Sequence, residues 1–359
     1  MKLRWGICST GRISNDFVLA LSLLPAEDHE VVAVAARSEA SAKRFAEKHK
    51  IATAYEGYEA LAKDVNVDIV HIGSWIHVHL PLCKLFLGHG KNVICETPLA
   101  LSKREVQEIL DLAKEKNLFF MESWWSRFFP AYTKLRELWV GGDIGDVKSV
   151  NASFGVPILN EERVQLKEFG GGGLMEFGVF LVNVTLMLFN QTPISWSTKG
   201  CLAPSGVDEL AVTTIVFPNN AIATLTSSAG VYLSNEMEIR GTKGYIKIPP
   251  LFWCPLKMEV TTFIQRSDRA MDIEEKREVM EFPLPSSKEG FNYPNTAGFQ
   301  YEAEAVRQCI MKGLKECPTV SHKDILLVHE ILQDARHDVG YISDADKEQQ
   351  TTTGPMPCQ

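Results

Sequence analysis

The stretch Gly6-Ile7-Cys8-Ser9-Thr10-Gly11-Arg12-Ile13-Ser14 decides the fold class of this 359-residue chain. It joins a short apolar run, residues 3–8, to a segment with apolar residues at helical spacing, which predicts a strand, a tight turn and a helix. Small residues in such a turn let backbone N–H groups and the helix N-terminus approach a pyrophosphate. In the register of G-x-G-x-x-G, the three glycine positions hold Ser9, Gly11 and Ser14. An ordinary strand-to-helix turn is the alternative, and the surrounding pattern must decide between them.

The alternation of strand and helix continues through the first third of the chain. Buried strands are predicted for 31–36, 68–72, 92–95 and 118–121, and helices for 38–49, 80–87 and a segment that begins at Ser102. Parallel strands need crossovers of this kind. We therefore predict a dinucleotide-binding Rossmann domain over residues 1–123. Its first turn is expected to contact the cofactor through Ser9, Thr10, Gly11, Arg12 and Ile13.

Beyond Ser123, short apolar runs separated by hairpin turns replace this alternation. Strands are predicted at 147–154, 211–217, 221–227, 237–240 and 245–248, and helices at 300–312 and 323–336. We expect a second domain over residues 124–343 that serves the substrate and dimerisation. Residues 344–359 are polar and lack periodicity, so a disordered tail is predicted there.

Length, composition and charge narrow the function classes. At roughly 150 residues per domain, the length predicts two domains. With 45% hydrophobic and 23% charged residues the chain is globular, and its net charge of −8 disfavours nucleic acid as a partner. No apolar run approaches the roughly 18 residues of a membrane span, and residues 1–11 contain no signal-peptide stretch, so we predict a cytoplasmic protein with no membrane partner. The eight cysteines show no spacing typical of zinc or a disulfide, and no metal is expected.

The end of the second strand carries the signal for the type of nucleotide. A carboxylate at this point would bind the ribose 2′-hydroxyl of NAD, but the chain has Arg37 followed by Ser38. A cation and a hydroxyl suit the 2′-phosphate of NADP. The alternative is that Arg37 is a solvated residue at a helix start. NADP (NADPH) is the predicted cofactor.

Several separated motifs together resemble the Gfo/Idh/MocA oxidoreductases. They are the turn C-S-T-G-R-I-S at 8–14, the strand end V-V-A-V-A-A-R at 31–37, the segment Cys95-Glu96-Thr97-Pro98 and the glycine run 170–173 before Leu174. The resemblance implies an α/β fold: an N-terminal Rossmann domain followed by a C-terminal α+β domain with an open, mostly antiparallel sheet. Such a sheet covers the nicotinamide and often pairs subunits, so a homodimer is expected. The most similar group within the family oxidises dihydrodiols and some sugars with NADP, which implies a small-molecule substrate.

The family's catalytic positions are altered in this chain. Most relatives have a lysine in a strand-end E-K-P motif, where this chain has Glu96-Thr97-Pro98. A threonine hydroxyl has no pKa near neutrality and cannot replace an ammonium in acid/base work. The second motif places a carboxylate and then His or Tyr four residues later, and here those positions hold Glu176 and Phe180. By this resemblance Glu96, Thr97 and His79 are also expected beside the cofactor.

Other polar residues are candidates to replace the missing proton donor. They are Glu176, His77, His79, Glu122, Arg127, Arg163 and Lys167. Glu176 keeps a carboxylate. His79 matches a family histidine, for which a helix-start or cofactor-neighbour role is expected, whereas His77 either faces the cleft or is a solvated or structural histidine. Arg127 and Arg163 match family positions near the substrate pocket and could hold a carbonyl or alkoxide, or else form structural ion pairs.

Three functions compete on this evidence. The first is an NADP-dependent oxidoreductase that acts on a hydroxyl or carbonyl of a small cyclic, dihydrodiol- or sugar-like substrate, with Glu176 as the participating carboxylate. The second is a catalytically silent NADP-binding protein with a regulatory or structural role, which Thr97 and Phe180 motivate. The third is changed chemistry, such as reduction of an imine, which is already electrophilic and needs less proton transfer.

Overall fold

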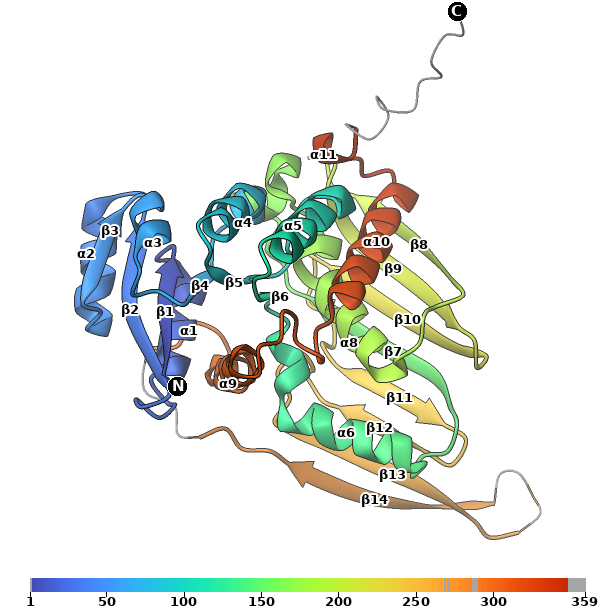
Figure 1. Cartoon of the computed structure of the whole chain (residues 1–359). Helices are drawn as coiled ribbons and strands as arrows, with labels where there is room; N and C mark the ends of the chain where they lie inside the picture. Colours follow the sequence, from blue (N-terminus) through green and yellow to red (C-terminus); the bar gives the residue numbers. More distant parts are fainter. Residues whose placement is uncertain (1, 268, 270–271, 286–289, 348–359) are drawn as a thin grey trace, which may run out of the picture.

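A six-stranded parallel sheet forms the first third of the computed structural model, which describes residues 2–267, 269, 272–285 and 290–347 (Figure 1). Its strands lie in the order β3-β2-β1-β4-β5-β6, and every pair is parallel. They are β1 Leu3–Cys8, β2 His29–Ala36, β3 Thr53–Glu56, β4 Ile69–Ile72, β5 Asn92–Cys95 and β6 Phe120–Glu122. The crossovers are α1 Arg12–Leu21, α2 Glu39–His49, α3 Glu59–Lys63, 3-10 turn η1 Ile76–Val78, α4 His79–Gly88 and α5 Lys103–Glu115. This is the predicted Rossmann arrangement, with β3 and α3 added.

Local sequence signals account for these elements. Strands β4 and β5 are almost entirely buried, as expected of parallel strands with helices on both faces. Ser38 caps α2 by accepting from Ser41 N, and Ser102 caps α5 by accepting from Glu105 N. The Glu105 carboxylate in turn accepts from Leu101 N at 2.9 Å, so the capping box forms close to its predicted position.

An eight-stranded sheet forms the second layer, in the order β14-β13-β12-β11-β7-β10-β9-β8. Its strands are β7 Val147–Gly155, β8 Ser195–Leu202, β9 Asp208–Phe217, β10 Ala221–Ser228, β11 Met237–Gly241, β12 Gly244–Ile248, β13 Lys257–Gln265 and β14 Ile273–Glu281. Only β7 and β10 pair in parallel within the described sheet, so the expectation of a mostly antiparallel sheet is confirmed. The predicted hairpin turns after Phe217 and Gly241 are both present.

Helices cover one face of this second sheet (Figure 1). They include α8 Val179–Phe189, which is buried on nearly all sides, and α10 His322–Asp338. The other helical elements are η2 Trp125–Phe128, α6 Pro130–Gly141, α7 Glu162–Gln165, η3 Lys167–Phe169, the π-helical turn η4 Leu174–Gly178, η5 Thr296–Gly298, α9 Phe299–Met311 and α11 Asp344–Lys347. Helix α9 returns to the first sheet and packs on α1, where Phe299 meets the ring of Phe17. The two layers are therefore joined beside the first helix.

Two expectations about the chain's segments need correction. The stretch Lys167–Phe189 is long and apolar enough to cross a membrane, although no such run was expected. Its apolar 18-residue window is 89% buried inside this fold, as expected of a core helix. The tail predicted to be disordered from residue 344 begins with α11, whose buried Asp346 accepts hydrogen bonds from Ser343 and Arg336. The rest of that tail, residues 348–359, lies outside the described residues.

Candidate functional site

The turn after β1 has the shape that a pyrophosphate site requires. Ser9 has a φ of +86°, a value that glycine usually adopts. Ser9 therefore has the backbone conformation of the first glycine of the motif. Gly11 precedes α1 in an extended conformation, and no side chain caps the helix. The first turn of α1 contains no acidic residue. Its N–H groups and the positive end of the helix are thus available to an anion.

The third glycine position is accommodated by a change on the facing strand. Ser14 is fully buried, and a Cβ at Gly73 would lie 2.4 Å from its Oγ. Gly73 follows β4, so its missing side chain makes room for the serine that replaces glycine on α1. The motif normally brings helix and strand close together through a glycine on the helix. Here the helix carries Ser14 and the glycine, Gly73, lies after the strand, so the close approach is kept.

A basic cavity of about 260 Å³ opens beside this turn, between α1 and α2. Its lining contains three cations, Arg12, Arg44 and Lys48, and no carboxylate among the residues described for it. Lys48 Nζ donates to Asn15 Oδ1 at 2.6 Å, so this cation is held by a neutral partner. Arg37 ends β2 with an exposed side chain, and Ser38 is the N-cap of α2. The cation and hydroxyl predicted from the sequence therefore lie at the strand end.

Thr97 is drawn into a buried network rather than left free at the strand end. Its hydroxyl donates to Glu122 Oε1 at 2.8 Å. The Glu122 carboxylate is fully buried and also accepts from Leu99 N and His329 Nε2, both at 3.0 Å. Glu96 is buried as well and accepts from His71 Nε2 at 2.9 Å. The side chains of Glu96, Thr97 and Glu122 are thus committed to contacts within the protein.

Glu176 and Arg163 form an ion pair in the second part of the chain, before α8. Arg163 Nη1 contacts Glu176 Oε2, and its Nη2 lies 3.2 Å from Glu161. Burial acts to lower the pKa of Arg163, but the charges of the Glu176 and Glu161 carboxylates act to raise it more strongly. The net effect is a raised pKa. Glu176 lies in the π-helical turn that leads into α8, a local irregularity that often occurs at functional sites. The pair combines a fixed cation with a half-buried carboxylate.

Aromatic rings pack around Phe180, four residues after Glu176. The Phe180 ring lies 5.8 Å from that of Phe154, in an edge-to-face arrangement. Phe154 is buried and stacks on Trp253 at 3.8 Å. The partly exposed Phe180 is therefore backed by core aromatic rings, and it carries no exchangeable proton.

The two histidine candidates occupy different environments. His79 is buried, and its ring nitrogens face the carbonyl oxygens of Ser74 and Pro98 at 3.0 Å. It therefore ties the start of α4 to the Thr97–Pro98 segment, in line with a helix-start role. His77 packs against Phe169 at 4.6 Å, and burial together with the nearby Arg37 charge lowers its pKa. His77 is thus half-buried and contacts an aromatic ring.

Arg127 and Lys167 lie in structural contacts. Arg127 is buried, pairs with Asp324 at 2.9 Å and donates to the carbonyl oxygen of Asn183. Burial lowers its pKa to about 10. This is the structural ion pair that the sequence left as an alternative for Arg127. Lys167 lies over the ring of Tyr341, 5.3 Å from its centroid.

Sequence reasoning missed a segment that reaches the nucleotide turn from the far end of the chain. Asp16 in α1 is fully buried and accepts from the backbone N–H groups of Asn292 and Tyr293 and from Thr296 Oγ1. Asn292 lines the basic cavity, and its side chain donates to Arg12 O. No local pattern in residues 290–296 signals this role, because it depends on one carboxylate some 280 positions earlier.

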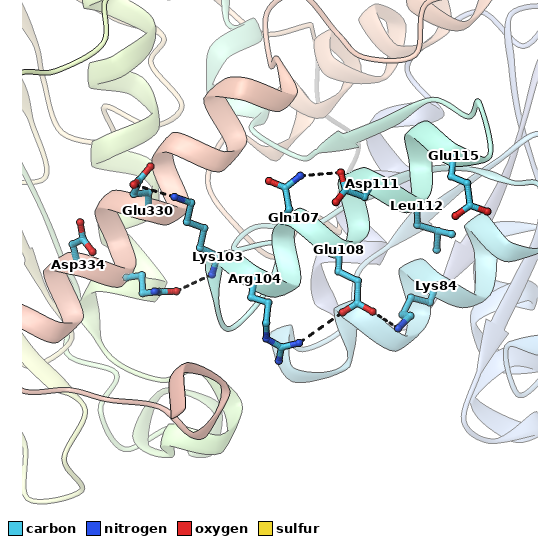
Figure 2. Close-up of a pocket in the computed structure, with 11 residues that line it drawn as sticks. Lys84, Lys103, Arg104, Gln107, Glu108, Asp111, Leu112, Glu115, Glu330 and Asp334 are labelled. Atoms are coloured by element: carbon cyan, nitrogen blue, oxygen red, sulfur yellow. Dashed lines mark hydrogen bonds and ion pairs between the residues drawn. The ribbon is translucent and has the colours of Figure 1, made fainter. Parts of the chain in front are cut away.

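A second groove lies elsewhere. It measures about 930 Å³ and runs between α5 and α10 on the outer surface, as Figure 2 shows. Its charges pair with one another: Lys103 with Glu330 at 3.0 Å, and Lys84 with Glu108. None of the predicted site residues lines it. The candidate site is therefore the region around the β1–α1 turn, Arg163 and Glu176.

Comparisons with known proteins show the family to which the chain belongs. Residues 3–123 match the model of the oxidoreductase family with an NAD-binding Rossmann fold, and residues 132–247 match the Gfo/Idh/MocA C-terminal domain. The chain is 41% identical to trans-1,2-dihydrobenzene-1,2-diol dehydrogenase from Danio rerio, over 97% of this chain and 100% of the relative. It is 38% identical to the enzyme of that name from Homo sapiens, with the same coverage.

Solved structures share the fold. Levoglucosan dehydrogenase in complex with NADH and levoglucosan superposes with a TM-score of 0.80, covering 95% of this chain and 98% of that one at 20% identity. A 3-ketoreductase from Actinomadura kijaniata with NADP and TDP-benzene gives a TM-score of 0.77 at 22% identity, covering 94% and 98%. Together with the family models and the relatives, these results confirm the resemblance drawn from the motifs. The chain belongs to the Gfo/Idh/MocA family and is an oxidoreductase that resembles dihydrodiol dehydrogenase.

Proposed function

We propose that this chain is an NADP-dependent oxidoreductase that acts on a hydroxyl or carbonyl group of a small cyclic substrate. The observation that carries the proposal is the end of β2, where an exposed Arg37 and the capping Ser38 stand in place of a carboxylate. The cavity with Arg12, Arg44 and Lys48 adds positive charge beside the same turn. Relatives named for a dihydrobenzene diol support a small ring as substrate.

The residues of the site divide into three tasks. The N–H groups of the β1–α1 turn hold the pyrophosphate, while Arg37 and Ser38 hold the 2′-phosphate. The bound nicotinamide supplies or accepts hydride. Arg163, kept in place by Glu176 and Glu161, stabilises negative charge on a carbonyl or alkoxide oxygen. The partly exposed Phe180, backed by the buried Phe154, provides an apolar wall for the ring.

The cofactor preference is tested by Arg37→Asp. The variant should lose affinity for NADPH while its affinity for NADH stays constant or rises, because a carboxylate repels the 2′-phosphate and accepts from a 2′-hydroxyl. Lys43→Asp is the control, since Lys43 lies on α2 in an exposed ion pair with Glu39. Fluorescence titration gives the four dissociation constants. Equal loss of NADPH affinity in both variants would contradict a specific role of Arg37.

A catalytically silent NADP-binding protein is the second candidate, and a specific observation favours it. The Thr97 hydroxyl is engaged by Glu122, and Phe180 has no proton to give. The decisive measurement is NADP reduction with trans-dihydrodiols and xylose, and NADPH oxidation with dicarbonyls. Tight NADPH binding without turnover on any of them would establish the silent protein. Turnover that rises in Thr97→Lys with Phe180→Tyr would show that the pocket still fits the family's chemistry.

We further propose a homodimer located in the cytoplasm. The face of the second sheet away from the helices carries apolar side chains, among them Ile222, which is 46% exposed beside Val216 on the neighbouring strand. Apolar surface of this kind marks association sites when it is continuous. Light scattering that gives a particle of 40.1 kDa at micromolar concentration would contradict the dimer.

A further inference from the structure

We propose that residues 156–169 form a lid over the nucleotide crevice, and that the rings of Phe169, Trp75 and His77 form a latch that holds this lid closed. The lid joins the end of β7 to the glycine run 170–173 and contains α7 and η3. The inference uses the binding of a nicotinamide nucleotide to the Rossmann domain of the family. It goes beyond the proposed function, because it assigns the step that admits and releases this nucleotide.

The crevice lies between strands β1 and β4. The strand order β3-β2-β1-β4-β5-β6 reverses between these two strands, and a sheet of this kind binds its ligand beyond the carboxyl ends of the strands at that point. The β1–α1 turn borders the crevice on one side, and residues 73–78, which follow β4, border it on the other. The two borders meet at their base, since a Cβ at Gly73 would lie 2.4 Å from Ser14 Oγ. Turn η1 therefore lies at the rim of the crevice.

The side chain of Phe169 reaches this rim from the second part of the chain. Its ring lies 4.6 Å from that of His77 and 5.3 Å from that of Trp75. The rings of Trp75 and His77 lie 6.0 Å apart, so the three side chains form one cluster. The next residue, Gly170, packs so closely that a Cβ on it would lie 2.9 Å from Ile76 Cγ2 in η1. These contacts join the end of the lid to the rim.

The lid is held by backbone bonds at both ends and is little buried between them. At its start, two backbone N–H groups donate to Ala229 O, at 2.9 and 3.1 Å. At its end, N–H groups of the glycine run donate back to Leu166 O and Val164 O, at 3.0 and 2.9 Å. Among residues 156–169, all of them described, Val164 alone is buried. A segment with so little buried surface opens at low cost, as lids over active sites do.

The latch is strong enough to favour the closed lid and weak enough to open. Phe169 and His77 are half-buried and Trp75 is 44% exposed, so the three rings are only partly withdrawn from water. Two aromatic contacts between lid and rim correspond to about 10-fold in the equilibrium between closed and open forms. The lid therefore opens often enough to exchange the nucleotide between turnovers.

The lid also carries Arg163, the cation of the proposed function. Arg163 pairs with Glu176, which follows the glycine run, and its Nη2 lies 3.2 Å from Glu161 on the lid itself. Closing the lid therefore retains the nucleotide and places Arg163 in the same movement. This coupling rests on the proposed function, whereas the latch needs only a bound nucleotide.

Phe169→Ala tests the latch through the rates of nucleotide exchange. Stopped-flow fluorescence gives kon when NADPH is mixed with the protein, and koff when excess NADP+ displaces it. Because the lid must open for entry and for release, both rates should rise by about 10-fold while the Kd stays unchanged. Phe263→Ala is the matched control: it removes a half-buried ring that lies 6.0 Å from Tyr245 on the second sheet, and it should change neither rate. A rise in koff alone would make Phe169 a contact of the cofactor and overturn the latch, as would unchanged rates.

Trp75→Ala removes the latch from the side of the rim, and it decides the matter if Phe169→Ala does not fold. Both exchange rates should rise in this variant too. The double variant should exchange NADPH no faster than Phe169→Ala, because the two substitutions remove the same contact. Hydrogen exchange of the lid amides should quicken in both single variants and stay unchanged in Phe263→Ala. Rate increases that simply multiply in the double variant, or lid amides that exchange as in the wild type, would overturn the inference.

The outcome does not depend on the substrate or on the preferred nucleotide. The same rates measured with NADH test the latch in a chain that prefers NAD, and none of the measurements needs turnover. A preference for NADH, or tight NADPH binding without turnover, would refute the proposed function and leave the latch intact. Binding of neither nucleotide would refute both.

Discussion

Replacing Glu122 by alanine removes the acceptor for three buried or half-buried donors at once. Thr97 Oγ1, Leu99 N and His329 Nε2 all bond to this carboxylate, which is fully shielded from solvent. The change therefore tests whether the strand-end segment of the site is held by this network.

The size of the effect follows from the donors left behind. A buried donor without a partner costs about 1–3 kcal/mol. Thr97 is half-exposed, so its hydroxyl can turn to water, but Leu99 N and His329 cannot. We expect Glu122→Ala to lower the free energy of unfolding by about 4 kcal/mol, a large share of the roughly 5–15 kcal/mol that folded domains possess. Glu122→Gln keeps the Oε1 acceptor for Thr97 and Leu99, and His329 can accept from its amide in the other tautomer, so it should cost about 1 kcal/mol.

Urea unfolding, followed by fluorescence and circular dichroism, gives the midpoint and slope for both variants. The reasoning predicts that the midpoint falls much further for alanine than for glutamine, with an unchanged slope. If both variants lose the same stability, the carboxylate's charge matters and its acceptor role does not. If Glu122→Ala stays within about 1 kcal/mol of the wild type, the network does not hold the segment.

Three further changes probe other parts of the site. Gly73→Ala sets a Cβ 2.4 Å from Ser14 Oγ, so it should weaken NADPH binding and lower Tm. Adding Ser14→Gly should recover part of the NADPH affinity and of the Tm. Effects of the two substitutions that simply add in calorimetry would contradict this packing. Burial raises the Asp208 pKa to about 6, so the folded state binds this proton more tightly than the unfolded chain and wild-type stability falls as pH rises from about 4 to about 6. In urea titrations, the free energy of unfolding of Asp208→Asn should therefore rise relative to that of the wild type between about pH 4 and about pH 6, close to the two pKa values. A difference between the two proteins that does not change with pH would refute the pKa shift. Arg127→Ala should cost about 3 kcal/mol of unfolding free energy without changing the Kd for NADPH, and a weakened Kd at full stability would place Arg127 in the cofactor site.

The nucleotide half was predictable because its signals are local. Each of its signals can be recognised from a few neighbouring residues. These signals are apolar runs with both faces buried, a turn of small residues and serine N-caps. Strand β3 escaped notice because its four residues, Thr53–Glu56, form a half-buried edge. The hairpin of β13 and β14 escaped notice too, since β14 is nearly all exposed and is held by backbone pairing, which leaves no apolar alternation.

The candidate site divides in the same way. Arg37 at the end of a strand and the altered positions 97 and 180 are visible in the chain's order, and they predict the nucleotide and the missing acid. The partners of these residues are not visible. Arg127 follows two tryptophans and Arg163 follows two glutamates, but neither neighbourhood names the partner: Arg127 is buried against Asp324, and Arg163 pairs with Glu176 in a half-buried position.

The sequence by itself determined that this is a Rossmann oxidoreductase scaffold whose usual proton donors are replaced. Its periodicity and turn chemistry act over a few residues and predict the scaffold, whereas the replaced donors are what its motifs imply through their resemblance to the Gfo/Idh/MocA family. Only the tertiary structure decided that Thr97 bonds to Glu122, that Gly73 makes room for Ser14, and that Asp16 binds the backbone of Asn292 and Tyr293. These contacts join residues far apart in the chain, and they form because buried polar groups must find partners wherever the packed fold brings one within hydrogen-bonding distance.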